Sequence, residues 1–314
     1  MRALIAAFLL AACAAPEAPA GSEASAATAP FVDEVAATPA FPPTPATLTL
    51  TCAGAFTQGG VALCRTLPGA DISVDGVAFG AADTQGWAVV GFLREHGPQA
   101  RIEAAANGST VVQAVDIADR AFDIQRVNGL PPQTVNPTDP EVIARIQRDT
   151  ALKQNAFGST APLEGWLDGF IWPVEGPISG RWGNQRILNG EPRDPHYGVD
   201  IAAPAGTPIR APASGTVVLA NPDMHFEGGL VFIDHGQGLI TMYLHMSRLD
   251  VAPGDSVTQG QVIGAVGATG RATGPHLCWR MRFRGRQLDP TVAIDGLAAA
   301  RAALLAQPNA SQSD

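Results

Sequence analysis

The chain is short of positive charge. Its 20 lysine and arginine residues are outnumbered by 29 aspartate and glutamate residues, which gives a formal net charge of −9. Binding a phosphate backbone requires a basic surface, so this balance excludes nucleic acid as the main partner. Charged residues make up only 16% of the chain, whereas glycine and proline are abundant, with 34 and 26 residues. This composition argues against a helical bundle or coiled coil and favours a loop-rich, mainly β protein of about two domains.

The apolar run near the N-terminus is too short to span a bilayer. Residues 3–12 follow the basic start Met1-Arg2 and have the length of a signal-peptide core. The sequence Leu10-Ala-Ala-Cys13 resembles a bacterial lipobox, in which Cys13 would be lipidated and become the mature N-terminus. The alternative is an ordinary signal peptide, cut near an Ala-x-Ala site, with Cys13 discarded. Both predict export, and Ala14 in place of a retention aspartate favours the outer membrane.

Residues 14–46 contain little apolar periodicity. They are rich in Ala, Pro, Ser and Glu, and such a segment cannot bury enough surface to offset its ordering entropy. We therefore expect a disordered tether, with a maximum reach on the order of 100 Å. Such a tether would carry a domain from a membrane into the cell-wall layer. A linker with no positional role is equally compatible with the composition.

Only four cysteines occur, namely Cys13, Cys52, Cys64 and Cys278. Cys52 and Cys64 bracket the glycine-rich turn Gln58-Gly-Gly60, and we expect them to form a hairpin disulfide in an oxidising compartment. Lipidation of Cys13 would then leave Cys278 unpaired. An odd cysteine in an exported protein calls for an explanation such as metal ligation or a reactive thiol.

Alternation and turn residues divide the rest of the chain into parts. Residues 47–128 contain short strands such as 71–75 and 111–117, and predict a small β-sandwich of immunoglobulin-like type. Residues 129–165 form a linker and a connecting helix that runs to about Asn155. Thr138 and Glu141 have the spacing of a capping box at its start. Residues 166–293 return to strands, at 217–219, 230–234, 239–245, 262–266 and 277–283. Residues 294–314 read as a surface helix over 294–306 and a frayed end.

Two short motifs contain candidate metal ligands. In His196-Tyr-Gly-Val-Asp200, both polar side chains would point to one side of an extended chain, roughly 13 Å apart along a straight strand. A kink is needed to bring them to one metal ion, and Gly198 supplies the freedom for it. In His276-Leu-Cys278, both groups lie on one face of a strand. Either motif alone also fits a chance pattern or a structural histidine beside a core cysteine.

The other histidines are less distinctive. His245 ends the apolar run 239–244 and is polar where a core residue would be expected. The remaining three are interpreted as a hairpin-turn residue (His235), a loop residue (His225) and a turn residue (His96).

Together the motifs form a stronger pattern, because they occur with several further segments in a fixed order over residues 172–290. This segment resembles the lysostaphin/LytM-type zinc peptidoglycan endopeptidases, which share a duplicated-hybrid-motif β-fold. The resemblance rests on seven segments: Ser179-Gly-Arg-Trp-Gly183, His196-Tyr-Gly-Val-Asp200-Ile-Ala-Ala-Pro204, Ala211-Pro-Ala-Ser-Gly-Thr-Val217, Ile233-Asp-His-Gly236, Tyr243-Leu-His245-Met-Ser247, Gly254-Asp-Ser-Val-Thr-Gln-Gly260 and Thr269-Gly-Arg-Ala-Thr-Gly-Pro-His276. It implies a mainly β chain, with a C-terminal, barrel-like peptidase domain preceded by the small β-sandwich and the helix.

The resemblance also implies roles for five residues. His196 and Asp200 match two ligands of a single zinc ion, and Cys278 occupies the position of the third, which is normally histidine. His245 and His276 match the two histidines that polarise the attacking water and stabilise the transition state. The family cleaves peptide cross-links of bacterial cell wall, so peptidoglycan stem peptides are the implied partner. Some members carry an upstream tyrosine that assists the oxyanion, and residues 188–191 contain none.

Cys278 leaves three hypotheses open. Thiolate is an accepted zinc ligand, but a second anionic ligand lowers the formal charge of the site from +1 to zero, which should weaken the acidification of water. The favoured hypothesis is an active zinc metalloendopeptidase of the periplasm, lipid-anchored to the outer membrane. The second is a catalytically degenerate relative that activates cell-wall amidases. The third is a structural, wall-binding lipoprotein.

Overall fold

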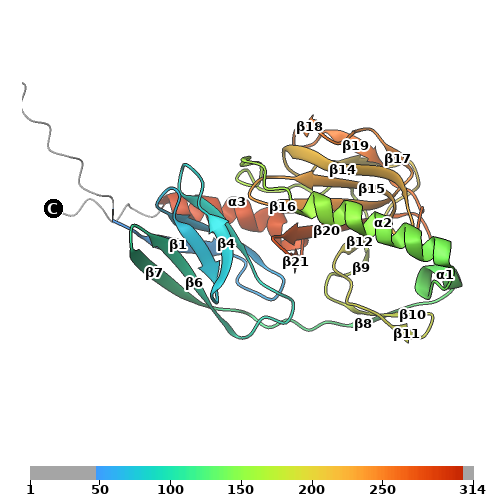
Figure 1. The fold of residues 1–314 in the computed structure, drawn as a ribbon, viewed down its shortest axis with the longest axis horizontal. Coiled ribbons are helices and arrows are strands. Elements are labelled where there is room, and N and C mark those ends of the chain that lie inside the picture. The colour runs from blue at the N-terminus through green and yellow to red at the C-terminus, as the bar shows by residue number, and fades with distance from the viewer. Residues whose placement is uncertain (1–46, 307–314) are drawn as a thin grey trace, which may run out of the picture. The chain divides into compact units, whose positions relative to one another are not determined.

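The computed structural model describes residues 47–306. The lipobox cysteine Cys13 and the predicted tether 14–46 lie outside the described residues. Within 47–306 no helix is both long and apolar enough to cross a membrane. The fold is mainly β, as the sequence predicts, with three helices in the described part (Figure 1).

The first β region consists of two small antiparallel sheets. One has the strand order β1-β2-β5 and the other the order β4-β3-β6-β7, so β2 and β3 lie in different sheets, as in an immunoglobulin-like sandwich. The strands are β1 (Leu50–Gly54), β2 (Val61–Thr66), β3 (Asp71–Val74), β4 (Val77–Ala81), β5 (Trp87–Gly91), β6 (Gln99–Ala106) and β7 (Ser109–Asp116). Cys52 and Cys64 are paired across β1 and β2 and form the predicted disulfide.

The segment after the two sheets crosses to the second β region. Strand β8 (Ile124–Val127) pairs in parallel with β10 (Gln185–Leu188), and β11 (Glu191–Pro192) completes this three-stranded sheet. The short helix α1 (Pro132–Val135) follows, and its buried Val135 contacts Leu130 and Leu188. Residues 124–135 are therefore built into the second β region by hydrogen bonds and a small apolar cluster of their own.

Helix α2 (Pro140–Phe157) lies against the largest sheet (Figure 1). Its Phe157 ring stacks on Phe232, with ring centroids 5.0 Å apart. The predicted capping box is wrong: the N-cap is Asp139, whose side chain accepts a hydrogen bond from the backbone N–H of Glu141. Pro140 fixes the first helical position, so the residue immediately before it takes the extended conformation of a cap.

The largest sheet has eight strands and carries the candidate site. Its order is β18-β14-β15-β16-β20-β12-β9, with β21 paired to β20. These strands are β9 (Ile178–Gly180), β12 (Val199–Ala202), β14 (Gly215–Met224), β15 (Gly228–Asp234), β16 (Leu239–Met246), β18 (Ser256–Val257), β20 (His276–Phe283) and β21 (Arg286–Leu288). A three-stranded sheet accompanies it, made of β13 (Pro208–Arg210), β19 (Val262–Ala265) and β17 (Arg248–Leu249).

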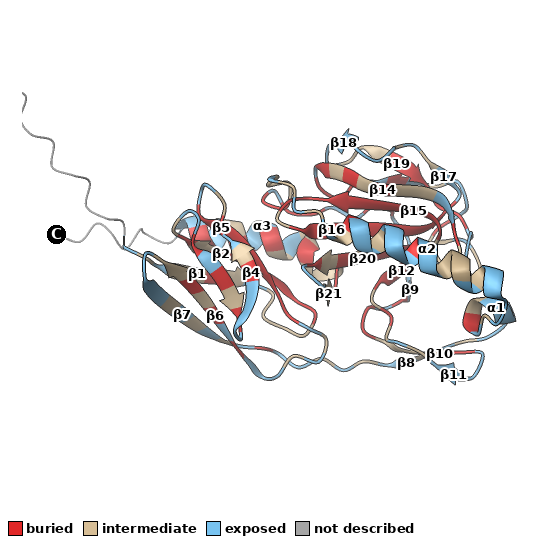
Figure 2. Cartoon of the chain, in the orientation of Figure 1, coloured by how far each residue is buried: buried red, intermediate tan, exposed pale blue. Residues whose placement is uncertain are grey.

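Alternation along β20 separates the core from the site. Leu277, Trp279, Met281 and Phe283 are buried in the main core. Cys278 points to the opposite face, where it joins a second buried cluster with Leu244 and Met242. Figure 2 shows β15 and β16 as continuously buried strands beneath α2, whose outer face is exposed, while β20 combines buried and partly buried residues. Both faces of these strands are covered, and this burial fixes the register that places the site residues.

The C-terminal helix α3 (Thr291–Ala306) contacts the first two strands, β1 and β2. The sequence predicts a surface helix over 294–306, but four residues at helical spacing are buried: Ala293, Leu297, Ala300 and Leu304. Next to its start, Asp289 forms an ion pair with Arg120, with 2.8 Å between Oδ2 and Nη2. The helix therefore uses one apolar face to cover the first β region.

Candidate metal centre

His196 and Asp200 meet because the chain bends between them. Strand β12 begins only at Val199, so His196 lies in the preceding loop, where its backbone exchanges hydrogen bonds with Asn184 and Gly183. Its Nε2 lies 3.2 Å from Asp200 Oδ1, compared with roughly 13 Å expected along a straight strand. The bend expected at Gly198 is therefore present.

Cys278 completes a set of three buried ligand atoms. It lies opposite Asp200 in the β12–β20 pairing, and its Sγ is 3.4 Å from His196 Nε2. All three ligand atoms lie within 4.8 Å of one another. Zinc bonds of about 2.0–2.3 Å in a tetrahedron put two ligand atoms roughly 3.3–3.6 Å apart. The separations of His196 Nε2 from Asp200 Oδ1 and from Cys278 Sγ, 3.2 and 3.4 Å, therefore fit a tetrahedral zinc ion, and three protein ligands leave its fourth position open.

The hydrogen bonding of Asp200 also fits a cation. Its Oδ2 accepts a 2.7 Å hydrogen bond from Arg186 Nη2, whereas Oδ1 is buried and accepts none from any described residue. Burial would raise the pKa of Asp200, but the neighbouring His196 and Arg186 lower it overall. Burial lowers the pKa of His196 to about 4, against the opposing effect of Asp200, so its ring is neutral near pH 7. A neutral imidazole and a carboxylate with a free oxygen are the forms that bind metal.

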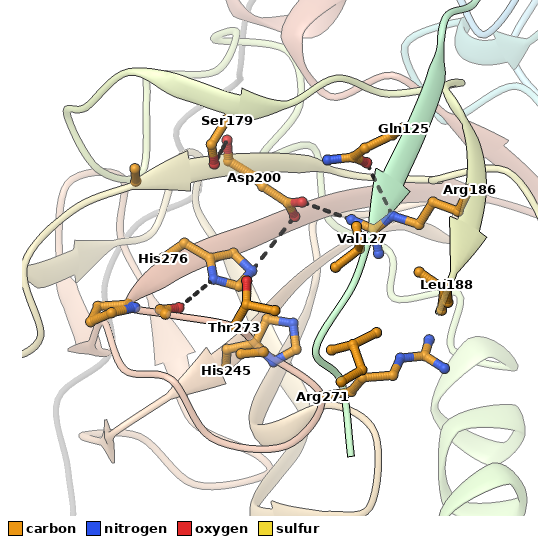
Figure 3. A pocket seen from close by; sticks show the side chains of 15 residues that line it. Gln125, Val127, Ser179, Arg186, Leu188, Asp200, His245, Arg271, Thr273 and His276 are labelled. Carbon is orange, nitrogen blue, oxygen red and sulfur yellow. Dashed lines mark hydrogen bonds and ion pairs between the residues drawn. The ribbon is translucent and has the colours of Figure 1, made fainter. Parts of the chain in front are cut away.

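His245 and His276 are held by backbone carbonyl groups. His245 Nδ1 lies 2.8 Å from Thr269 O, and His276 Nδ1 lies 2.8 Å from Gly274 O. A carbonyl oxygen only accepts, so each Nδ1 carries the proton and each neutral ring leaves Nε2 as an acceptor. The two ring centroids are 4.7 Å apart, and His276 Nε2 is 3.8 Å from Asp200 Oδ1. In Figure 3 both rings face the same cavity as Asp200.

The backbone of His245 is in an unusual conformation, with a φ of 66°. This left-handed region is unfavourable for residues other than glycine and is concentrated at functional sites. Burial and the nearby His276 lower the pKa of His245 to about 3. The strand continues one residue past the predicted end, to Met246, and His245 is its buried, strained penultimate residue, whose side chain lines the cavity.

Two arginines that the sequence reasoning missed contact the candidate ligands. Arg186, from β10, bridges Asp200 and Gln125 of β8, with 3.2 Å between its Nε and Gln125 Oε1 (Figure 3). Arg280, from β20, donates from Nε to Cys278 Sγ at 3.4 Å. Burial raises the pKa of the Cys278 thiol to about 11, with Arg280 acting in the opposite direction. Arg280 lies two residues after Cys278, a spacing that places both on one strand face.

A cavity of about 310 Å³ opens in front of Asp200 and Arg186, while His196 and Cys278 lie outside its lining. Asp200, His245 and His276 line one part of it, while residues of β8 and the following loop, including Gln125 and Leu130, line another. The segment 124–130 therefore forms a wall of the cavity, which no motif in that segment indicates.

The other histidines lie apart from this cavity. His235 lies in the hairpin loop between β15 and β16, as predicted, and is fully buried there, with Nδ1 2.8 Å from Ser214 O and Nε2 2.7 Å from Thr241 Oγ1. His225 follows β14, with Nε2 3.3 Å from Gln133 O, and His96 lies 3.3 Å from Asp75 Oδ2 in the first β region. The lining of the cavity includes no tyrosine from residues 47–306.

Comparison with known proteins gives this site a context. The sequence profile of peptidase family M23 matches residues 194–290. Over 95 residues the chain is 43% identical to the peptidoglycan DD-endopeptidase ShyA of Vibrio cholerae and 44% identical to the DD-carboxypeptidase/endopeptidase Mpg of Neisseria meningitidis. Each match covers 30% of this chain and 22% of the relative, so the chain spans about a fifth of the length of these curated relatives.

The likeness extends further in a solved structure. The crystal structure of a putative peptidase M23 from Pseudomonas aeruginosa is 33% identical to this chain, with a TM-score of 0.58. The similarity covers 76% of this chain and 95% of that one, so it takes in strands outside residues 194–290. With nearly the whole of that relative matched and the family profile centred on the site, this chain belongs to peptidase family M23, the lysostaphin/LytM-type peptidases.

Proposed function

We propose that the chain is a zinc-dependent endopeptidase that hydrolyses peptide cross-links of bacterial peptidoglycan. The observation that carries the proposal is one buried arrangement. His196, Asp200 and Cys278 present three ligand atoms at the spacing of a tetrahedral metal, and His245 and His276 face the same cavity. When bound, zinc would act as a Lewis acid on the scissile carbonyl group and lower the pKa of a bound water.

The two histidines are suited to move protons. With Nδ1 fixed to a carbonyl oxygen, each neutral ring presents Nε2 as a base, and after accepting a proton the same atom becomes a donor. We assign to His276 the role of accepting a proton from the attacking water. Its Nε2 lies 3.8 Å from Asp200 Oδ1, and hence beside the metal position. His245 would then stabilise the charge that develops on the carbonyl oxygen, and either ring can return a proton to the leaving amine.

The charges around the cavity favour an anionic substrate. Arg271 and Arg186 both line the cavity, but the charge of Arg186 is offset by Asp200, so the attraction for an anion rests on Arg271. Burial and nearby arginines lower the pKa of Arg271 only to about 10, so it stays charged at neutral pH. Stem peptides of peptidoglycan carry carboxylates, which a guanidinium group binds well. The relatives named as peptidoglycan endopeptidases support the same substrate class.

A metal titration followed by a digestion tests the proposal. Purified protein, kept reduced at Cys278, should bind one zinc ion per chain and release soluble products from cross-linked muropeptides. His276→Ala should retain zinc and lose hydrolysis, whereas His96→Gln, which lies in the first β region, should retain both. Equal product from wild type and His276→Ala would remove His276 from the mechanism, and a protein without stoichiometric zinc would end the enzyme hypothesis.

Some features favour the second hypothesis, a degenerate member that activates cell-wall amidases. Without metal, Asp200 is already neutralised by Arg186, and burial keeps the Cys278 thiol protonated, so the ligand set is stable when empty. His196 Nδ1 is buried without a hydrogen-bond partner in residues 47–306, although ligand histidines usually donate through their second nitrogen. For this function, amidase stimulation should survive His196→Ala. A requirement for His196 would count against it.

We also propose that the protein acts outside the cytoplasm, in the periplasm, anchored by lipid at Cys13. The Cys52–Cys64 disulfide supports an oxidising compartment. Metabolic labelling with a radioactive fatty acid should mark wild type and leave Cys13→Ala unlabelled. Label on Cys13→Ala, or none on wild type, would reject the anchor.

A further inference from the structure

We infer that Cys278 and Arg280 are a matched pair, in which the guanidinium group of Arg280 holds the thiolate ligand and offsets its negative charge. The inference rests on the proposed metal site, but not on the identity of the peptide that is cleaved. Arg280 is thus a positioning residue that acts through Cys278.

The local geometry is built around both side chains. They project from the same face of β20, and Arg280 Nε lies 3.4 Å from Cys278 Sγ. Gly198, inside the loop that joins the other two ligands, makes room for them. A Cβ atom there would lie 2.7 Å from Arg280 Cγ and 3.0 Å from Cys278 Sγ, closer than ordinary contact allows. Any side chain at residue 198 would therefore displace Arg280 or Cys278 from its present position.

Each anionic ligand has its own guanidinium partner. Arg186 donates to Asp200 Oδ2 at 2.7 Å, and Arg280 donates to Cys278 Sγ. Replacing a neutral histidine ligand with a thiolate adds a negative charge to the site, and a hydrogen bond from a permanent cation draws charge away from the sulfur. A second anionic ligand would lower the ability of the metal to acidify a bound water. Arg280 therefore offsets part of this loss.

The pair also explains why cysteine and histidine are not interchangeable here. A histidine that binds metal through one ring nitrogen has an N–H on the other, and that N–H usually donates to a carboxylate or carbonyl oxygen. Arg280 has only donors. A histidine at position 278 would therefore face a second donor and a positive charge. Restoring histidine alone should harm the site unless residue 280 becomes an acceptor.

A double-mutant cycle on the full chain tests this coupling. Zinc dissociation constants, from competition with a chromophoric chelator, are measured for wild type, Arg280→Gln, Cys278→His and the double variant Cys278→His/Arg280→Gln. We expect Arg280→Gln to weaken zinc binding by about tenfold or more in the cysteine background. In the histidine background, the same change should have no effect or tighten binding, and Cys278→His/Arg280→Glu should bind at least tenfold more tightly than Cys278→His.

Two further measurements separate this role from a merely structural one. In the cobalt(II)-substituted protein, Arg280→Gln should shift the thiolate-to-metal charge-transfer band, and Arg280→Lys, which keeps a positively charged donor, should recover part of the zinc affinity even where Arg280→Gln folds poorly. Arg282→Gln is the matched control, because Arg282 is the next arginine on this face and lies over Phe157, 3.9 Å from the ring centroid. It should leave zinc affinity within twofold.

The outcomes distinguish this inference from the proposed function. If Arg280→Gln weakens zinc binding by the same factor in both backgrounds, or if the wild type binds no zinc, the matched pair is refuted. If the coupling and the spectral shift are found but muropeptides are not cleaved, the pair stands and the endopeptidase proposal fails.

Discussion

The position of Asp200 can be tested through a glycine that it touches. Gly180, in β9, lies opposite Asp200 in the sheet. A Cβ atom at residue 180 would lie 2.4 Å from Asp200 Oδ2 and 3.0 Å from its Cγ, whereas ordinary contact begins at 3.4 Å. The backbone of Gly180 is outside the left-handed region, so Gly180→Ala adds a methyl group without backbone strain. The substitution therefore acts on the carboxylate.

The expected size follows from these distances. Relief of the clash requires the carboxylate to move by about 1 Å, the difference between 3.4 and 2.4 Å. A bound metal tolerates errors of only about 0.2 Å in its ligand distances. The same movement breaks the 2.7 Å contact with Arg186. We expect Gly180→Ala to weaken zinc binding by about 10- to 100-fold, or about 1.4–2.8 kcal/mol.

The assay is zinc competition against a chelator, at a temperature where the metal-free protein is folded. That temperature is chosen from thermal unfolding of the zinc-free variant, because an extra methyl group in a packed site costs about 1–3 kcal/mol. Gly97→Ala is the control, since a Cβ atom there has no neighbour within 4 Å. Zinc affinity of Gly180→Ala within twofold of wild type, in a folded protein, would show that Asp200 is not a ligand in the geometry described.

Three further predictions concern other parts of the molecule. Replacing Cys52 and Cys64 with serine should lower the free energy of unfolding by roughly 3 kcal/mol in a denaturant titration, because the disulfide closes a loop with a sequence separation of 12, and zinc affinity should not change. Burial lowers the pKa of His235 to about 4, so between about pH 6.5 and 4 the unfolded chain binds a proton that the folded protein excludes. Stability should fall as the pH drops through this window, and His235→Gln should reduce that slope; an unchanged slope would contradict the assignment. At His245, whose φ is 66°, glycine should be more stable than alanine by about 1 kcal/mol in thermal unfolding, and both variants should lose hydrolysis. Equal unfolding midpoints would argue against backbone strain there.

Much of the fold could be predicted from local patterns. The strands around residues 230–234, 239–245 and 277–283 alternate or are continuously apolar, and a glycine-containing turn separates the first two. The ligand candidates could be named because His196, Asp200 and Cys278 lie in two short motifs, which the resemblance over residues 172–290 joined into one site. The disulfide could be predicted because Cys52 and Cys64 flank a short turn.

The remaining parts depend on contacts between distant segments. Arg186 becomes a partner of Asp200 only because β10 pairs with β8 beside the cavity, and no pattern around residue 186 indicates this pairing. Arg280 could be predicted as a neighbour of Cys278 from the sequence, because residues two apart on a strand share one face. The burial of the apolar face of α3 could not be predicted from the sequence, because it depends on contacts with the distant strands β1 and β2.

The contact of α3 with β1 and β2 also affects when the protein can fold. These elements come from opposite ends of the described chain, so β1 and β2 are covered only after α3 has been synthesised. Contacts between such distant segments are slow to form, because the entropy of closing the intervening loop is lost before the contact stabilises it. Until α3 arrives, the apolar surface of β1 and β2 that it covers stays open to other chains. The first β region therefore reaches its final packing only after α3 has been synthesised and has docked on β1 and β2.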